Sequence, residues 1–146
     1  MAAAEGVSLN HISRESSDIN RLANFYQEIL GFERIEAPKL EFGVIWLKHP
    51  SSSLSLHLIE RNPNYKLPEG PFSAATPGAV NDPEHLARGH HVAFGVTNYE
   101  SFVQTLKDKG IPIFENRQPD GKTKQLFFFD PDGNGLEVGN WATAHK

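Results

Sequence analysis

The hydrophobic and polar positions repeat one order of patterns twice along the chain. Alternating residues predict strands, and apolar residues spaced by three and four predict one amphipathic helix in each half. In the first half the pattern predicts a helix over 19–30 and strands at 9–13, 32–36, 42–47 and 54–60. In the second half it predicts a helix that starts at 99, has its inward face over 99–106 and ends at Gly110, and strands at 91–96, 111–115, 124–129 and 135–140. Each half is therefore a βαβββ module, which makes the chain an α+β protein.

Polar residues and glycines mark the ends of both predicted helices. Residues 16–18 read Ser-Ser-Asp and offer N-caps for the first helix, and Gly31 is suited to its C-cap. Asn98 can cap the second helix, which we expect to end at Gly110. The predicted starts and stops thus agree with the hydrophobic periodicity.

The spacing of particular residues supports an internal duplication. The same 46 positions separate His11 from His57 (57 − 11) and His91 from Glu137 (137 − 91). The first histidine of each half precedes the helix-ending glycine by 20 positions (31 − 11) and 19 positions (110 − 91). Several matching intervals together indicate a repeat.

Residues 61–88 separate the two modules and differ from them in character. They contain half of the ten prolines and show no periodicity, which is typical of a lid, a binding loop or a linker. We therefore expect a single domain over 7–146, made of modules 7–60 and 89–141 joined by this proline-rich loop.

Composition narrows the classes of partner and chemistry. The 146 residues include no cysteine, which excludes a disulfide scaffold, a thiolate zinc site and cysteine catalysis. The net charge of −4, with no basic cluster, argues against binding to nucleic acid or an anionic membrane. No apolar run approaches the length needed to span a membrane, so we expect a cytoplasmic protein.

The last two predicted strands form a hairpin that carries one unusual carboxylate. Residues 130–133 read Asp-Pro-Asp-Gly, a turn by composition. On the strand that follows, alternation places Leu136 and Val138 on one face and Glu137 on the other, between Gly135 and Gly139.

Three histidines share the setting of Glu137. Each lies on the first or last strand of its module. Each has an apolar neighbour on the opposite face of the strand and shares its own face with small residues. Small residues on one face predict a hollow, into which imidazole and carboxylate groups would converge as a metal site needs. The predicted metal ligands are His11, His57, His91 and Glu137. The other histidines lack this pattern and are predicted to be surface residues: His49, His85, His90 and His145.

These motifs resemble the vicinal oxygen chelate superfamily, which includes glyoxalase I, fosfomycin- and bleomycin-resistance proteins and extradiol dioxygenases, and most strongly the plant glyoxalase-I-like proteins. Outside the central loop the resemblance covers nearly the whole chain. The residues that carry it are Leu9–Ser13, Phe25–Tyr26, Leu30–Phe32, Gly89–Phe94 and Phe129–Gly133, with Glu137.

The resemblance implies two βαβββ modules forming a cupped mixed sheet around one divalent metal ion, which would be zinc, nickel, manganese or iron. It implies that the four predicted ligands hold this ion, that the partner is a small-molecule substrate, and that the protein is a homodimer. Glyoxalase I isomerises the hemithioacetal of methylglyoxal and glutathione, so the resemblance implies a glyoxalase-I-like lyase or isomerase in which Glu137 is the general base.

Three positions depart from the glyoxalase I pattern. His57 stands where those enzymes have glutamate or glutamine. Glu15 stands where they place an arginine that pairs with glutathione, and Arg61 replaces an asparagine. An acidic Glu15 beside the pocket is expected to repel the carboxylates of glutathione.

These departures leave other functions open. His11, His91 and Glu137 also resemble the two-histidine, one-carboxylate triad of Fe(II) dioxygenases. A protein that binds a metal or a small ligand without turnover, or an inactive scaffold, would carry the same fold.

Overall fold

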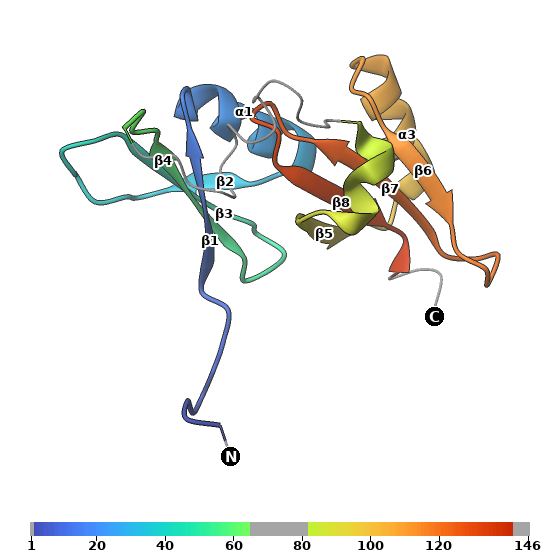
Figure 1. The fold of residues 1–146 in the computed structure, drawn as a ribbon, viewed down its shortest axis with the longest axis horizontal. Helices are drawn as coiled ribbons and strands as arrows, with labels where there is room; N and C mark the ends of the chain where they lie inside the picture. The colour runs from blue at the N-terminus through green and yellow to red at the C-terminus, as the bar shows by residue number, and fades with distance from the viewer. Residues whose placement is uncertain (1, 65–81, 142–146) are drawn as a thin grey trace. The chain divides into compact units, whose positions relative to one another are not determined.

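The computed structural model describes residues 2–64 and 82–141 (Figure 1). The chain divides into two compact units, Met1–Pro71 and Phe72–Lys146. Each unit contains one four-stranded mixed sheet and one long helix. The predicted duplication of a βαβββ module, and with it the α+β class, is confirmed.

The first unit forms a sheet with strand order β1-β4-β3-β2. Its first and last strands pair in parallel, and the two other pairings are antiparallel. Its elements are β1 (His11–Ser16), α1 (Ile19–Leu30), β2 (Glu33–Ile35), β3 (Val44–Lys48) and β4 (Ser55–Glu60).

The second unit repeats this topology with strand order β5-β8-β7-β6, and β5 pairs with β8 in parallel. A short 3₁₀ helix, η1, precedes the sheet. The elements are η1 (Pro83–Arg88), β5 (His91–Gly95), α3 (Tyr99–Asp108), β6 (Phe114–Arg117), β7 (Lys124–Phe129) and β8 (Gly135–Gly139).

The ends of α1 are those that the sequence predicts. The Asp18 carboxylate accepts a hydrogen bond from the Arg21 amide at 3.0 Å, which satisfies one of the free amides of the first turn. Gly31 ends the helix at φ 77°, in the left-handed region that glycine adopts without a steric penalty. At the start of α3, Asn98 occupies the N-cap position, but its side chain donates to the Ser101 hydroxyl instead of capping.

Two strand boundaries differ from the prediction for identifiable reasons. The strand predicted at 111–115 begins at Phe114, because the Ile111 amide donates to the Leu106 carbonyl and completes the end of α3. The strand predicted at 9–13 runs from His11 to Ser16 instead, because β4 offers it pairing partners through that whole length.

The proline-rich segment predicted to be a loop contains an ordered element at its C-terminal end. The Asp82 carboxylate accepts from the Glu84 amide and begins η1, with Pro83 in the first position. Leu86 of η1 is buried, which ties this element to the second unit. Residues 65–81 of the segment lie outside the described residues.

Each long helix covers one face of the sheet of its own unit. In the second unit, Phe102 of α3 contacts Phe128 of β7, with ring centroids 6.2 Å apart. The buried apolar residues of the first unit are Leu22, Ala23, Tyr26, Phe32, Leu47, Leu56 and Leu58. Because the apolar residues of the strands face the helix, the polar side chains of the strands lie on the opposite face of each sheet.

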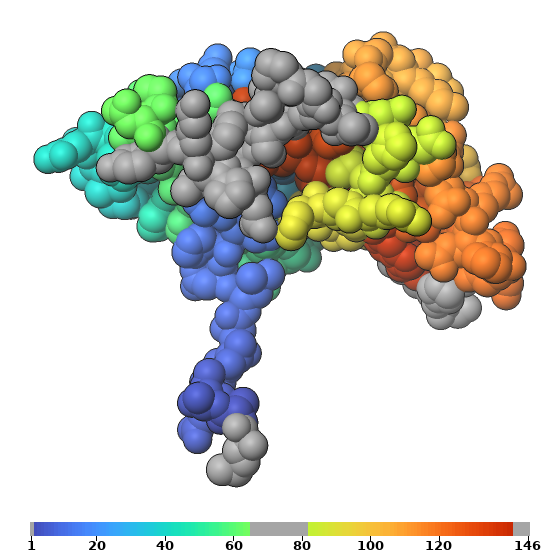
Figure 2. All heavy atoms as spheres, viewed as in Figure 1, coloured from blue at the N-terminus to red at the C-terminus, as the bar shows by residue number. Residues whose placement is uncertain are grey.

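The first unit begins with a segment that leaves the sheet. Residues 2–10 extend from β1 as a narrow arm (Figure 2). Val7 and Leu9 on this arm are 81% and 72% exposed.

The turn between β7 and β8 is built around the buried carboxylate of Asp130. Its Oδ1 accepts from the amides of Asp132 and Asn134 at 2.9 and 3.0 Å, and its Oδ2 accepts from the Asn134 side chain at 2.8 Å. These bonds fix the turn, and the turn fixes the register of the two strands.

We expect Asp130→Ala to lower the free energy of unfolding by about 1.5–3 kcal/mol, the range for hydrogen bonds to a charged group. The measurement is urea denaturation of the purified protein. Asp130→Asn is the matched control: it keeps one acceptor oxygen and should lose clearly less. Equal losses for the two variants would mean that the carboxylate does not hold the turn.

Candidate metal centre

The topology brings the four predicted ligands together as two pairs. In the first unit Ser13 lies opposite His57, and in the second Ala93 lies opposite Glu137. His11 and His91 therefore precede the level of their partners by the same two residues, on the same face of the sheet. Among residues 2–64 and 82–141, no group of three or more potential ligands is gathered in a form ready to hold a metal.

The imidazole of His91 is oriented by backbone carbonyls. Its Nδ1 lies 3.1 Å from the Leu86 oxygen and 3.0 Å from the Gly89 oxygen. Carbonyl oxygens only accept, so Nδ1 carries the proton and donates it. This leaves the lone pair of Nε2 free, which is the arrangement of a metal-binding histidine with its second nitrogen anchored.

The freed nitrogen of His91 faces the carboxylate of Glu137. His91 Nε2 and Glu137 Oε2 are 4.0 Å apart, too far for a hydrogen bond. His91 Nε2 and Glu137 Oε2 are the atoms that would hold a divalent ion here, because imidazole nitrogens and carboxylate oxygens both bind such ions. Glu137 is only 6% exposed, and its Oε1 accepts a hydrogen bond from Gln125 Nε2 at 2.5 Å. The donor chemistry of this pair fits a divalent cation.

The pair in the first unit is arranged as an aromatic stack. The rings of His11 and His57 lie 3.9 Å apart at 13°, and Trp46 stacks on the other side of His57 at 4.0 Å and 4°. Imidazole lone pairs lie in the ring plane, so nearly parallel rings do not direct both donors at one point. If His11 and His57 bind the same ion, one ring must turn out of the stack.

Both stacked histidines have features suited to ligation. The His11 Nδ1 is 2.8 Å from the Asn10 side-chain oxygen, so it donates there and leaves Nε2 free. Burial, and secondarily the nearby His11, lower the pKa of His57. A lowered pKa keeps the imidazole neutral near pH 7, which is the form that binds metals.

The hollow predicted over the small residues of β8 is occupied in the structure, so that part of the prediction is wrong. A Cβ at Gly135 would lie 2.3 Å from a Leu86 methyl and 2.5 Å from the His90 carbonyl. A Cβ at Gly139 would lie 2.7 Å from the Trp141 indole. The glycines are needed because they admit Leu86 and Trp141, which pack against the strand on either side of the Glu137 position.

The charge of Glu15 is offset in the structure. The Arg61 Nε lies 3.7 Å from the Glu15 Oε1, and both side chains are mostly buried. Neither of these two atoms has a hydrogen-bond partner within the described part of the chain. The expected repulsion of anionic substrates by Glu15 is therefore weakened by the guanidinium beside it.

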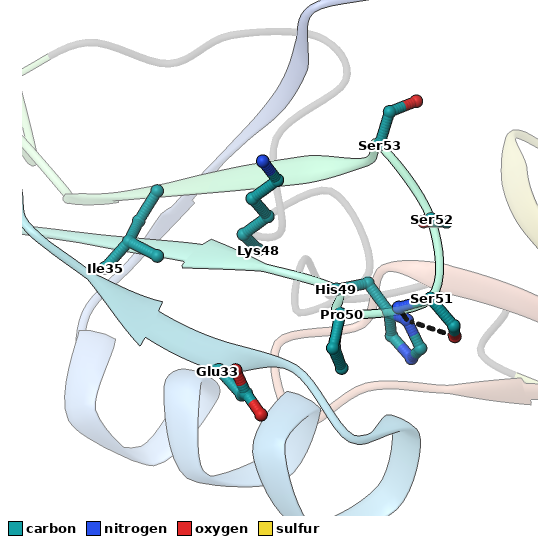
Figure 3. Close-up of a pocket in the computed structure, with 8 residues that line it drawn as sticks. All are labelled: Glu33, Ile35, Lys48, His49, Pro50, Ser51, Ser52 and Ser53. Atoms are coloured by element: carbon teal, nitrogen blue, oxygen red, sulfur yellow. Dashed lines mark hydrogen bonds between the residues drawn. The ribbon is translucent and has the colours of Figure 1, made fainter.

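A separate hollow lies at the β3–β4 turn and contains none of the predicted ligands (Figure 3). His49 lies at the edge of this hollow. The sequence pattern predicted it to be a surface residue, but its side chain is partly buried and hydrogen-bonded. Its Nδ1 accepts from the Ser51 amide at 3.2 Å, and its Nε2 donates to the Leu30 carbonyl at 2.7 Å. With both nitrogens engaged, His49 ties the turn to the end of α1. The residues of this hollow are Glu33, Ile35, Lys48, His49, Pro50, Ser51, Ser52 and Ser53.

The three remaining histidines were also predicted to be surface residues. His85 and His90 are exposed, as predicted. His145 lies outside the described residues.

The sequence did not lead us to four side chains that contact or flank the two ligand pairs. Gln125 could have been found from the hairpin turn, because the register places it two residues from the position opposite Glu137. Trp46 lies directly opposite His57 on β3, another consequence of register. Leu86 and Trp141 come from outside the sheet, and no periodic pattern indicates their positions.

We expect Gly135→Ala to lower the free energy of unfolding by about 1–3 kcal/mol, because the added methyl must displace η1 or bend the strand. Gly95→Ala on the neighbouring strand is the control. Its Cβ would be 3.9 Å from Trp141, an ordinary contact, so its effect should stay within about 0.5 kcal/mol. Thermal or urea unfolding of both variants tests this, and similar stabilities would show that η1 is not packed on Gly135.

Comparison with known proteins identifies the family. The profile of the Glyoxalase/Bleomycin resistance protein/Dioxygenase superfamily matches residues 8–138. Glyoxylase I 4 of Arabidopsis thaliana is 30% identical over 91% of this chain and 70% of that protein. A lactoylglutathione lyase of Schizosaccharomyces pombe is 29% identical over 89% of this chain, which spans 46% of that protein's length. The metallothiol transferase FosB of Staphylococcus saprophyticus is 26% identical over 90% of this chain and 75% of its own.

Solved structures of differently named proteins share the fold. A lactoylglutathione lyase from Agrobacterium tumefaciens matches with a TM-score of 0.60 at 18% identity, over 93% of this chain and 95% of its own. The antibiotic binding protein TnmS3 from Streptomyces sp. CB03234 matches with a TM-score of 0.64 at 18% identity, over 94% of this chain and 98% of its own. Within the described residues, no helix has the length and apolar character needed to cross a membrane. From its duplicated βαβββ modules and the match over 8–138, the chain belongs to the Glyoxalase/Bleomycin resistance protein/Dioxygenase superfamily.

Proposed function

We propose that this protein is a divalent-metal-dependent, glyoxalase-I-like lyase or isomerase that acts on a small substrate with adjacent oxygens. The observation that carries the proposal is the arrangement of His91 and Glu137. The histidine is anchored through Nδ1, and its free Nε2 faces a buried carboxylate oxygen at 4.0 Å. A buried acceptor facing a second acceptor is what a cation would stabilise.

In this proposal His91 and Glu137 anchor the ion, and His11 and His57 complete the ligand set. His11 needs no change of protonation, because its Nδ1 already donates to Asn10. His57 must give up its stacking on Trp46 or His11 to contribute. Loss of His57 should therefore weaken metal binding less than loss of His91. Three imidazoles and one carboxylate suit zinc, nickel, manganese and iron alike.

When bound, a divalent metal supplies Lewis-acid polarisation of the substrate oxygens and holds the substrate in a fixed orientation. The protein's own contribution is Glu137, which accepts a proton at Oε2, since Gln125 occupies Oε1. Leu86 and Trp141 limit the space on either side of that carboxylate.

Relatives support the substrate class but do not fix it. One similar protein is named a lactoylglutathione lyase and another a metallothiol transferase, both of which imply a thiol-containing substrate. The Glu15–Arg61 pair could serve such a substrate, because it presents a cation and an anion four residues beyond the two histidines. We therefore propose the hemithioacetal of methylglyoxal and glutathione as the first substrate to assay.

A second candidate is a protein that binds a flat ligand without turnover. The stack of Trp46, His57 and His11 favours it, because parallel aromatic rings offer a planar surface on which another ring can lie. A similar fold is used by an antibiotic binding protein. Ligand binding without metal dependence or product formation would support this function over the first.

We also propose that the protein is a homodimer, as the resemblance to the family implies. Light scattering of the purified protein, with and without added metal, measures the mass directly. A monomer under both conditions would contradict this part of the proposal.

We expect about one divalent ion per chain after dialysis against zinc, nickel, manganese or iron. His91→Ala should lower metal affinity by more than about 100-fold, since removing a ligand should exceed the 10–100-fold cost of removing an outer partner. His57→Ala should lower it less, and the exposed His85→Ala, the matched control, should leave it unchanged. Competition with a chromophoric chelator measures these affinities. A metal-free wild-type protein with no thermal shift on metal addition would contradict the proposed function.

Glu137→Gln should abolish turnover of the hemithioacetal, because the amide cannot accept the proton that the carboxylate takes. The variant keeps the shape of the side chain, so near-wild-type unfolding should accompany the loss. The assay follows formation of the thioester product by ultraviolet absorbance, with oxygen uptake recorded in parallel. Unchanged turnover would remove Glu137 from the base role, and oxygen consumption with a catechol would favour the dioxygenase alternative.

A further inference from the structure

We infer that Gln125 is a positioning residue, which holds Glu137 so that a single carboxylate oxygen, Oε2, is available to a metal ion. This inference rests on the proposed metal-dependent function and adds a residue that the ligand set does not include. It follows from the hydrogen bonds that Gln125 makes in two opposite directions.

Strand register explains how Gln125 reaches Glu137. Phe127 is the residue directly opposite Glu137, and Gln125 lies two residues earlier in β7, opposite Gly139. Gly139 contributes no side chain of its own, although Trp141 packs on it, and the amide of Gln125 reaches past it to Glu137. Its Nε2 donates to Glu137 Oε1 at 2.5 Å. Gln125 and Glu137 are 8% and 6% exposed, so water does not compete for this bond.

Two further amides determine which way Gln125 points. The Asn116 Nδ2 and the Gln118 Nε2 donate to the Gln125 Oε1 at 3.2 and 3.1 Å. With its oxygen held by these donors, Gln125 can offer only its nitrogen to Glu137. The Glu137 Oε1 therefore receives an N–H of Gln125 at the end of this chain of hydrogen bonds.

The consequence concerns how Glu137 binds an ion. One oxygen is tied to Gln125 and the other faces His91 at 4.0 Å. Glu137 would therefore offer Oε2 to an ion, and the hydrogen bond from Gln125 opposes a turn of the carboxylate that would present both oxygens. A carboxylate fixed in advance loses less rotamer entropy on binding than one that must be ordered by the ion.

The test compares metal affinity in the full-length wild-type protein and in Gln125→Met, which keeps the length of the side chain and removes the amide. We expect zinc affinity, measured by chelator competition, to fall by about 10–100-fold, the usual cost of losing a partner of a metal ligand. With cobalt(II) as the probe, the visible spectrum should change as well, because the carboxylate is free to bind through both oxygens. A spectrum is a readout that a loss of packing alone would not move.

Two other variants keep the test decisive. Gln104→Met is the matched control, because it makes the same change on α3, where the amide donates only to Asp108 on the same helix. Asn116→Ala with Gln118→Ala removes the two exposed donors and leaves Gln125 in place. It should weaken zinc binding in the same direction by a smaller factor, and it decides the question if Gln125→Met does not fold.

The outcomes separate this inference from the function on which it rests. Weaker zinc binding with an altered cobalt spectrum in Gln125→Met, and wild-type behaviour in Gln104→Met, would support the positioning role. Wild-type affinity and spectrum in a folded Gln125→Met would overturn it and leave the proposed function intact. No metal binding by the wild-type protein itself would overturn the proposed function, and the positioning role with it.

Discussion

The parallel pairing of the first and last strands of each module is the constraint on which the rest of the structure depends. Two parallel neighbours cannot be joined by a tight turn, so the chain between them must travel away and return. Here the intervening chain supplies one helix and two strands, which cover one face of the sheet and extend its edge. The opposite face then carries residues that are 46 positions apart in sequence but lie on adjacent strands, with a register offset of two residues.

A second layer of contacts gives these paired residues their chemical character. His91 presents a free Nε2 because its Nδ1–H donates to the Leu86 and Gly89 carbonyls. Glu137 keeps one free oxygen because Gln125 occupies the other. Among residues 2–64, no hydrogen bond of this kind anchors His57, which is held instead between two aromatic rings. The two modules share a topology, yet in the described part of the chain the second module alone has a histidine and a carboxylate facing each other.

Local patterns in the sequence predicted the fold well because most of its elements depend on local rules. The Asp18 cap, the left-handed Gly31 and the Asp130 turn each follow from residues within a few positions. The four candidate ligands could be named from alternation and repeat spacing, and their shared metal ion stays a prediction. The start of β6 could not be predicted, because the Ile111 amide serves the end of α3. The occupants above Gly135 and Gly139 could not be predicted either, since they come from segments without periodicity.

The packing of Leu86 and Trp141 on those glycines has a consequence for how such a protein can diversify. Both side chains belong to flanking segments, one before β5 and one after β8, and neither belongs to the strands that carry His91 and Glu137. Substitutions at 86 and 141 can widen or narrow the space beside the carboxylate while the strands that present the ligands stay unchanged. The glycines do not share this freedom, because a methyl group on either one collides with its neighbour. The width of the space beside Glu137 and the side chains proposed as metal ligands are thus encoded in different stretches of the chain, and one can change in evolution while the other is retained.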